Sequence, residues 1–228
     1  MTRNLFVSLG CGLWFVLTPL GALSEEAPTD TRILAIVQRM ESTFKTLEDY
    51  TCEVDQIFYL NGVEEERNRF KFFFKKPKKI RVDFSSPYPS LTLVYLGGEP
   101  EVTVIPFRFF SALKFRFSVT DPKIRTRAGQ RIPQTDMGYF IEFLFRNLET
   151  VKQGDGSYGE DGEKVRFVLR AMDYIEGKML ETYQITISKR VWLPVHIERY
   201  SLEGKRLEVT DIRNYVVDSH LQDALFRP

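Results

Sequence analysis

Hydrophobic and polar positions alternate through the stretch from Arg67 to Phe84, which reads RNRFKFFFKKPKKIRVDF. Successive side chains of a strand point to opposite faces, so every second residue shares a face. The first run places on one face Phe70, Phe72, Phe74 and Lys76. After a break at Pro77, the same alternation continues with Ile80, Val82 and Phe84. The pattern predicts a hairpin with one aromatic wall, and it leaves open whether that wall is closed core or lines a cavity.

Two other segments have apolar residues at helical spacing. In residues 31–47 the apolar positions are Ile33, Leu34, Ile36, Val37, Met40, Phe44 and Leu47. This spacing predicts an amphipathic helix with one wide apolar stripe, which needs a partner surface. The second run, Met137 to Val151, is apolar around most of its circumference. We therefore expect the second helix to be sunk into the body of the protein.

The rest of the chain has the pattern of short strands. A strand from Tyr50 to Leu60 places Val54 and Phe58 on one face, interrupted by Gln56, and Asn61-Gly62 favours a two-residue hairpin turn. Further alternating runs lie at residues 91–96, 101–107, 165–174, 180–188, 193–200 and 205–217. Residues 121–134, rich in Arg, Pro and Gly, read as a loop. The fold class predicted is α+β, mainly β, with an antiparallel meander that curls into a barrel or a sandwich.

The first 24 residues differ from the rest. A basic start at Arg3, an apolar run and small residues at Ala22 and Ser24 are typical of a secretory signal cleaved before Glu25. Cys11 lies in the apolar run without the usual lipid-attachment pattern around it, so ordinary cleavage is favoured over a lipoprotein. We expect an exported chain with a single domain over residues 25–228 and no membrane span after cleavage. Cys52 is then the sole cysteine, with a buried apolar role.

Composition and motifs narrow the function. The 32 basic and 31 acidic residues balance, which argues against a nucleic-acid partner. The 19 Phe residues need a large core or an apolar pocket. Only His196 and His220 are available as imidazole ligands, and no spacing resembles a metal site, a phosphate loop or a nucleophile motif. Glu64 to Glu66 are interpreted as a solvated hairpin tip. We therefore expect no enzyme activity, no catalytic residue, no metal and no cofactor.

The order of these features resembles the LolA-like periplasmic lipoprotein carriers and outer-membrane lipoprotein-sorting proteins. The resemblance rests on the exported leader, one amphipathic helix, the step Val54-Asp55-Gln56, and a Phe-rich strand ending in a basic residue before Pro77. It continues in the closing hairpin LPVHIERYSLEGKRLEVTDIRNYVVDSHLQDALF, with Ala224-Leu225-Phe226 as its terminal signature. The stretch GQRIPQTDMGYFIEFL is more similar to an uncharacterised branch of the family than to the carrier.

The resemblance implies an incomplete antiparallel β-barrel, with amphipathic helices covering an apolar concave face that holds acyl chains of lipoproteins or lipids. The implied lipid-binding wall comprises Val54, Phe58, Phe70, Phe72, Phe74, Ile80 and Val82. The implied lid comprises Ile33, Ile36, Val37, Met40, Phe44 and Lys76. In the carrier, an Arg before Pro bonds to the lid, and here the matching residue is Lys76, which lacks the planar fork of Arg.

Three functions follow as alternatives. The first is a monomeric periplasmic carrier that moves lipoproteins or lipids towards the outer membrane, with inner- and outer-membrane transfer partners. The second is an envelope sensor or scaffold that recognises lipoproteins through the same cup without transport. The third is an envelope enzyme that acts on lipid or glycan, for which the sequence nominates no residue.

Overall fold

The computed structural model describes residues 29–110, 112–151 and 157–228 of the chain. The predicted signal sequence, residues 1–24, and Cys11 lie outside the described residues. No helix in the described ranges is long and apolar enough to cross a bilayer.

The described part of the chain forms one antiparallel sheet of 11 strands. In chain order the strands are β1 Asp49–Leu60, β2 Val63–Lys75, β3 Lys79–Ser86, β4 Thr92–Tyr95, β5 Glu101–Ile105, β6 Phe115–Ser118, β7 Tyr158–Glu160, β8 Lys164–Met172, β9 Leu180–Ser188, β10 Leu193–Tyr200 and β11 Arg206–Val217. Their order across the sheet is β6-β5-β4-β3-β2-β1-β11-β10-β9-β8-β7. β6 and β7 are the two edges, so the sheet is open. The predicted incomplete barrel is confirmed, and a closed barrel is ruled out for these strands.

The predicted local patterns hold in the sheet. Asn61 and Gly62 have φ angles of 53° and 81°, the left-handed conformation that a type I′ hairpin turn requires. They join β1 to β2 with Leu60 paired to Val63. Along β2, Phe72 and Phe74 are buried on one face while Lys71 is exposed on the other. The alternation therefore predicted the correct face of each residue.

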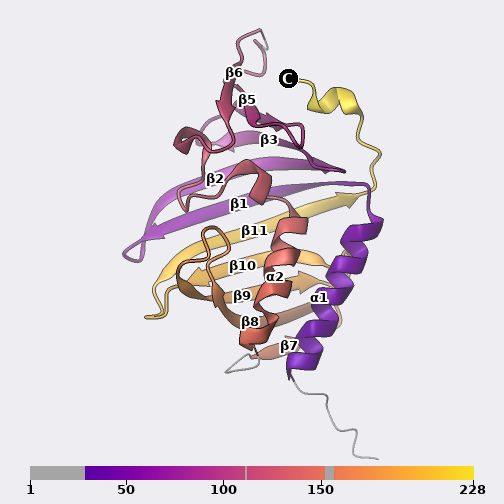
Figure 1. The fold of residues 1–228 in the computed structure, drawn as a ribbon, viewed down its shortest axis with the longest axis vertical. Helices are drawn as coiled ribbons and strands as arrows, with labels where there is room; N and C mark the ends of the chain where they lie inside the picture. Colours follow the sequence, from indigo (N-terminus) through magenta and orange to yellow (C-terminus); the bar gives the residue numbers. More distant parts are fainter. Residues whose placement is uncertain (1–28, 111, 152–156) are drawn as a thin grey trace, which may run out of the picture.

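Two helices lie on the concave face of the sheet (Figure 1). They are α1 Thr29–Thr46 and α2 Met137–Val151, which match the predicted segments closely. Both cross β8, β9 and β10 rather than the middle of the Phe-rich hairpin (Figure 1). The apolar stripe of α1 packs with α2 and this part of the sheet in one cluster, to which α1 contributes Ile33, Ile36, Val37 and Met40. We call this part of the concave face the helix-covered half.

The segment between β6 and α2, residues 119–136, crosses the concave face in front of the first strands (Figure 1). It contains two short 3-10 helices, η1 Pro122–Ile124 and η2 Ile132–Gln134. Ile132 is buried in a second cluster with Phe72, Val82 and Leu93. We call residues 119–136 the strap, and the face of β1 to β5 that it crosses the strap-covered half.

The end of the chain is fixed to the start of β1 and to β3. Asp49, which is 1% exposed, accepts hydrogen bonds from the backbone N–H groups of Ser219 and Leu221. The terminal 3-10 helix, η3 Asp223–Phe226, packs beside β3 with Phe226 buried. These contacts tie the last residues to the sheet.

Candidate functional site

A cavity of about 260 Å³ lies between the sheet and the strap. Its sheet side is formed by β1 to β5 together with β10 and β11. Its cover is formed by strap residues and by the first residues of α2, including Ile124, Ile132 and Met137. The cavity thus lies in the strap-covered half, next to the end of α2.

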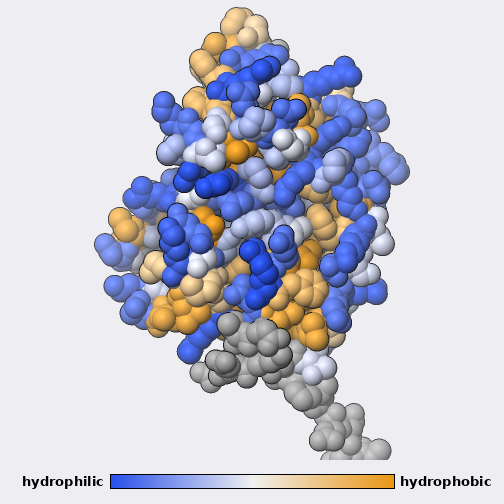
Figure 2. All heavy atoms as spheres, viewed as in Figure 1, coloured by the Kyte–Doolittle hydropathy of each residue, from blue (hydrophilic) through white to orange (hydrophobic). Residues whose placement is uncertain are grey.

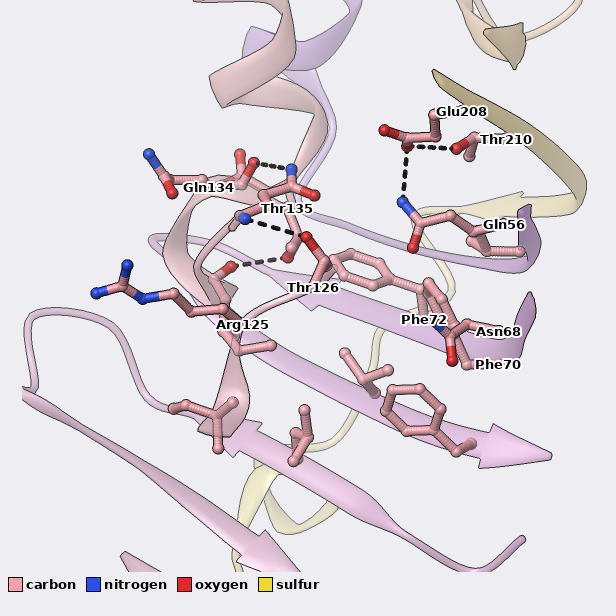
Figure 3. Close-up of a pocket in the computed structure, with 18 of the residues that line it drawn as sticks. Gln56, Asn68, Phe70, Phe72, Arg125, Thr126, Gln134, Thr135, Glu208 and Thr210 are labelled. Carbon is pink, nitrogen blue, oxygen red and sulfur yellow. Dashed lines mark hydrogen bonds between the residues drawn. The ribbon is translucent and has the colours of Figure 1, made fainter. Parts of the chain in front are cut away.

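The floor of the cavity is mostly apolar. The apolar side chains of the sheet that line it are Cys52, Val54, Phe70, Phe72, Val82, Phe84, Leu93, Val104, Ile197 and Ile212, joined by Leu91 just before β4. Figure 3 shows Phe70 and Phe72 on the floor, below the strap residue Thr126. Rings of the floor contact one another, since Phe70 and Phe84 have centroids 5.4 Å apart. Such a floor favours a ligand with hydrocarbon surface.

The strap is held firmly at its α2 end. Asp136 accepts a hydrogen bond from the Tyr139 N–H at 3.2 Å and so caps α2. Its second oxygen lies 3.3 Å from Lys78 Nζ, outside hydrogen-bond geometry. The Tyr50 hydroxyl accepts a hydrogen bond from the Met137 N–H at 3.1 Å. This end is therefore part of the core.

The middle of the strap is held by an exposed ion pair and by a partly buried hydrogen bond. Arg127 forms a two-point ion pair with Glu65 of β2, at 3.1 Å and 2.6 Å, in which the Arg127 side chain is 53% exposed. The Tyr174 hydroxyl donates to Gln130 Oε1 at 3.3 Å. The Nε of Arg125 is buried without a hydrogen-bond partner. Exposed ion pairs contribute little, whereas Gln130 is buried, so the weakest attachment of the strap is at Arg127.

A row of buried polar side chains closes one end of the cavity. Their contacts run from strand to strand: Gln56 Nε2 donates to Glu208 at 2.8 Å, and Arg199 Nη1 donates to the other oxygen of Glu208 at 2.5 Å. Arg199 also binds both oxygens of Glu181 at 2.9 Å. Figure 3 shows Gln56 and Glu208 directed towards each other beside the Phe floor. We call these four residues the polar belt.

The carboxylates of the polar belt stabilise the positive charge of the buried Arg199. Burial alone would lower the pKa of Arg199, but the nearby Glu208, Tyr174 and Glu181 raise it well above its ordinary value. The guanidinium also lies 4.9 Å from the centre of the Tyr174 ring. The belt therefore gives the cavity a polar end, and the Phe floor gives it an apolar one.

The thiol and the phenols near the cavity stay protonated. Burial raises the pKa of Cys52, and burial also raises the pKa of Tyr174 and of Tyr50. A thiol is nucleophilic only as the thiolate, so Cys52 is not an activated nucleophile at neutral pH. Among the described residues, no group of three or more His, Cys, Asp and Glu side chains could hold a metal ion. The main chemical feature of the site is therefore its apolar floor.

The predicted wall residues divide into two groups. Val54, Phe70, Phe72 and Val82 line the cavity. Phe74 and Ile80 do not line the cavity and are packed with Leu47 and Tyr50 in the core. Phe58 is buried on β1 beyond Gln56 and is outside the cavity lining. Residues on one face of a strand thus meet different surroundings along its length.

The predicted lid residues also divide. Ile33, Ile36, Val37 and Met40 are buried in the helix-covered half and do not line the cavity. Phe44, near the end of α1, contacts Phe74 with ring centroids 5.5 Å apart. Lys76 Nζ donates to the Lys45 carbonyl oxygen at 2.7 Å and lies 5.9 Å from the centre of the Phe44 ring. Lys76 thus binds the C-terminal end of α1.

The sequence interpretation assigned no role to the strap or to the polar belt. The strap residues that line the cavity are Lys123, Ile124, Arg125, Thr126, Gln130, Ile132, Gln134, Thr135 and Asp136. Two isoleucines, Ile124 and Ile132, within a run of Arg, Pro and Gly were the available signal. The belt side chains come from β1, β9, β10 and β11, so no local spacing connects them.

The sequence has no match among known protein-family models, and no curated protein matches it. Solved structures share the fold. The lipoprotein LppX of Mycobacterium tuberculosis aligns with a TM-score of 0.50 at 9% identity, over 85% of this chain and 99% of LppX. A LolA superfamily protein from Nitrosomonas europaea aligns with a TM-score of 0.42 at 12% identity, over 86% and 97% of the two chains.

MucB aligns with a TM-score of 0.50 at 8% identity, over 87% of this chain and 63% of MucB. This chain therefore spans less than two thirds of MucB. A structure of the complex of MucB with MucA is known from Pseudomonas aeruginosa. At such identities the similarity shows the fold alone, which this chain shares with LppX and MucB.

Proposed function

We propose that this protein is a periplasmic carrier that binds acyl chains of lipoproteins or lipids and moves them towards the outer membrane. The observation that carries the proposal is the cavity with its Phe70 and Phe72 floor, which opens under the strap in a fold shared with the lipoprotein LppX. It acts as a monomeric binding protein rather than an enzyme. Residues 1–24 direct export and are removed, leaving one domain over residues 25–228.

Apolar burial supports this function in energetic terms. Each methylene transferred from water to an apolar floor contributes about 0.8 kcal/mol. Affinity therefore rises with chain length until the cavity is filled. The polar belt at the cavity end suits the polar group that joins an acyl chain to its lipid or protein, because its amide and carboxylate groups can hydrogen-bond.

In this proposal the cover over the acyl chain is the strap. α1 contributes indirectly: Phe44 and Lys76 link its last turn to the closed end of the Phe-rich hairpin. The remaining predicted lid residues stabilise the helix-covered half. Opening the strap at Arg127 therefore admits the chain without separating α1 from the sheet.

Binding of a fluorescent fatty acid tests the proposal. Val54 is partly exposed and lines the cavity, so Val54→Trp fills the cavity with little disturbance of the core. We expect this variant to lose affinity by about tenfold or more, because the Trp side chain excludes two or more methylenes of the acyl chain from the cavity. The matched control is Ile57→Trp, on the opposite face of the same strand, which keeps wild-type affinity. Equal affinity of both variants, or no binding by the wild type, contradicts the proposal.

Mass spectrometry of lipids that co-purify with the protein from its native envelope adds an independent arm. Acylated species in repeated preparations support the carrier function. Their absence, together with failure to bind the fluorescent probe, contradicts it.

The envelope sensor or scaffold remains the alternative. It uses the same cavity for recognition but does not release the chain to a second membrane. Transfer of a fluorescent acylated peptide from donor to acceptor vesicles separates the two functions. Transfer accelerated by the protein supports the carrier, and tight binding without transfer supports the sensor.

A further inference from the structure

The connection between β5 and β6 exposes aromatic rings to solvent. Phe109 is 84% exposed and Phe110 is 56% exposed, and about half of Phe107 and of Phe115 is also exposed. Figure 2 shows hydrophobic residues gathered at the top of the molecule, above this hairpin. We call these four rings the Phe tip. A contiguous apolar patch of this kind marks an interaction surface, because most Phe side chains of a soluble domain are packed inside.

Local hydrogen bonds hold the Phe tip in shape. The Phe110 N–H donates to the Phe107 carbonyl at 2.9 Å, and the Leu113 N–H donates to the Phe110 carbonyl at 3.2 Å. The rings of Phe107 and Phe109 contact each other with centroids 5.7 Å apart. The described residues of this connection therefore present the rings outwards.

The charged residues within the tip segment are all basic, but they have partners outside it: Arg108 Nη1 lies 3.5 Å from Asp83, and Lys114 Nζ donates to the Pro228 oxygen at 2.8 Å. Residues 106–118 contain Arg108, Lys114 and Arg116 and no Asp or Glu. The Arg116 side chain is 74% exposed, and its nearest carboxylate, on Glu101, is 3.9 Å away. Cations that flank exposed rings fit a surface that is apolar at depth and anionic at its boundary. A bilayer with anionic head groups has both properties.

The Phe tip adjoins the cavity. The Arg108 N–H donates to the Ser90 carbonyl at 3.2 Å, and its side chain donates to the Phe84 carbonyl at 3.3 Å. Phe84 lines the cavity, as does Tyr88, which is 59% exposed. The wall of the cavity therefore reaches the surface at Tyr88, on the side where the Phe tip is attached.

We propose that the Phe tip is a membrane-docking element that inserts its rings into the interface of an anionic bilayer, with Lys114 and the 74% exposed Arg116 on the head groups. Docking through this hairpin places the Tyr88 side of the cavity next to the lipid. The inference goes beyond binding of acyl chains, because it concerns a different surface and holds whatever the cavity contains.

Flotation with vesicles tests the docking. We expect the purified protein to bind vesicles of phosphatidylcholine and phosphatidylglycerol more tightly than phosphatidylcholine alone, and added salt to weaken the binding. The double variant Phe109→Ser/Phe110→Ser is expected to lose about tenfold or more in affinity. Arg116→Gln is expected to lose about fivefold, the equivalent of one cation at the surface.

Matched controls lie on hairpins far from the Phe tip in the sequence. Leu202→Ser and Met179→Ser remove apolar side chains that are 55% and 67% exposed, and both should bind vesicles like the wild type. A Phe109→Trp variant supplies a second readout. Its added fluorescence should shift to the blue with anionic vesicles and be quenched by brominated lipid, over the constant signal of Trp192.

Two outcomes overturn the proposal: a wild type that binds neither kind of vesicle, or control variants that lose as much affinity as the double variant. The first outcome would indicate that the Phe tip binds a protein partner rather than a membrane. Binding of the fluorescent fatty acid by the double variant, measured in parallel, keeps this result separate from the proposed carrier function.

Discussion

The two halves of the concave face are built on the same sheet and closed in different ways. In the helix-covered half, α1 and α2 fill the space above β8 to β10, and Phe143, Phe167 and Ile185 are each at most 2% exposed. In the strap-covered half, a segment with two short 3-10 helices leaves a cavity above Phe70 and Phe72. A regular helix with an apolar stripe fills a concave surface, whereas an irregular segment bridges it.

The two halves also differ in how closely their covering segments are packed. A methyl group added to Gly138 of α2 would lie 2.6 Å from Phe44 Cε1 of α1, so the two helices are in direct contact there. By contrast, the strap is attached at its middle through the exposed pair of Arg127 and Glu65. Each half has its own buried cluster, and the space for a ligand lies in the strap-covered half.

The largest expected effect is a loss of stability in the helix-covered half. Phe167→Ala should lower the free energy of unfolding by about 3–5 kcal/mol, because it opens a void in a closely packed core. Phe70→Ala, on the partly exposed cavity floor, should lower it by about 1 kcal/mol. Chemical denaturation measures both. Similar losses for the two variants would mean that the floor of the cavity is packed like core.

The boundary between the halves is the second place to test. Arg199→Met should lower the free energy of unfolding by about 3 kcal/mol, because it leaves Glu181 and Glu208 buried without their cation. The control Arg213→Met removes an exposed pair with Asp211 and should change stability by less than about 1 kcal/mol. If Arg199→Met matches its control, the polar belt contributes no more to stability than an exposed ion pair.

The smallest effect concerns opening of the strap. Arg127→Ala should leave the free energy of unfolding within about 1 kcal/mol of the wild type, since the pair with Glu65 is exposed. It should nevertheless raise the rate at which a small uncharged maleimide labels Cys52, on the cavity floor, by about 2–5-fold.

Arg166→Ala, which breaks a comparably exposed pair with Asp161 on the outer face of β8, is the control and should leave the labelling rate unchanged. Cys52→Ala provides the blank. Equal labelling of the Arg127 and Arg166 variants would show that the strap is not the entrance to the cavity.

Much of the local structure could be predicted from the sequence. The period of the apolar residues predicted α1, α2 and the Phe-rich hairpin, and Asn61-Gly62 predicted its neighbouring turn. The alternation predicted which face of β2 is buried. These features follow from backbone geometry within one helix or one pair of strands, so the information lies in neighbouring residues.

The partners of those elements were decided only by the tertiary structure. The apolar stripe of α1 indicated that the helix packs against an apolar surface, but it did not indicate which one. In the structure α1 packs over β8 to β10 rather than over the Phe70 and Phe72 floor. Phe72 and Phe74 share a face, yet Phe72 lines the cavity and Phe74 is packed beneath Phe44. Whether a residue on this face of β2 lines the cavity or is packed in the core depends on which segment covers it.

The contacts of the strap and of the polar belt could not be predicted from the sequence pattern either. Arg127 meets Glu65, and Arg199 meets Glu181 and Glu208, through contacts between segments that are distant in the sequence. The sequence by itself determined the elements and their apolar faces, because these depend on short-range periodicity. Only the tertiary structure decided which face became core and which became cavity, because that depends on which distant segment covers it.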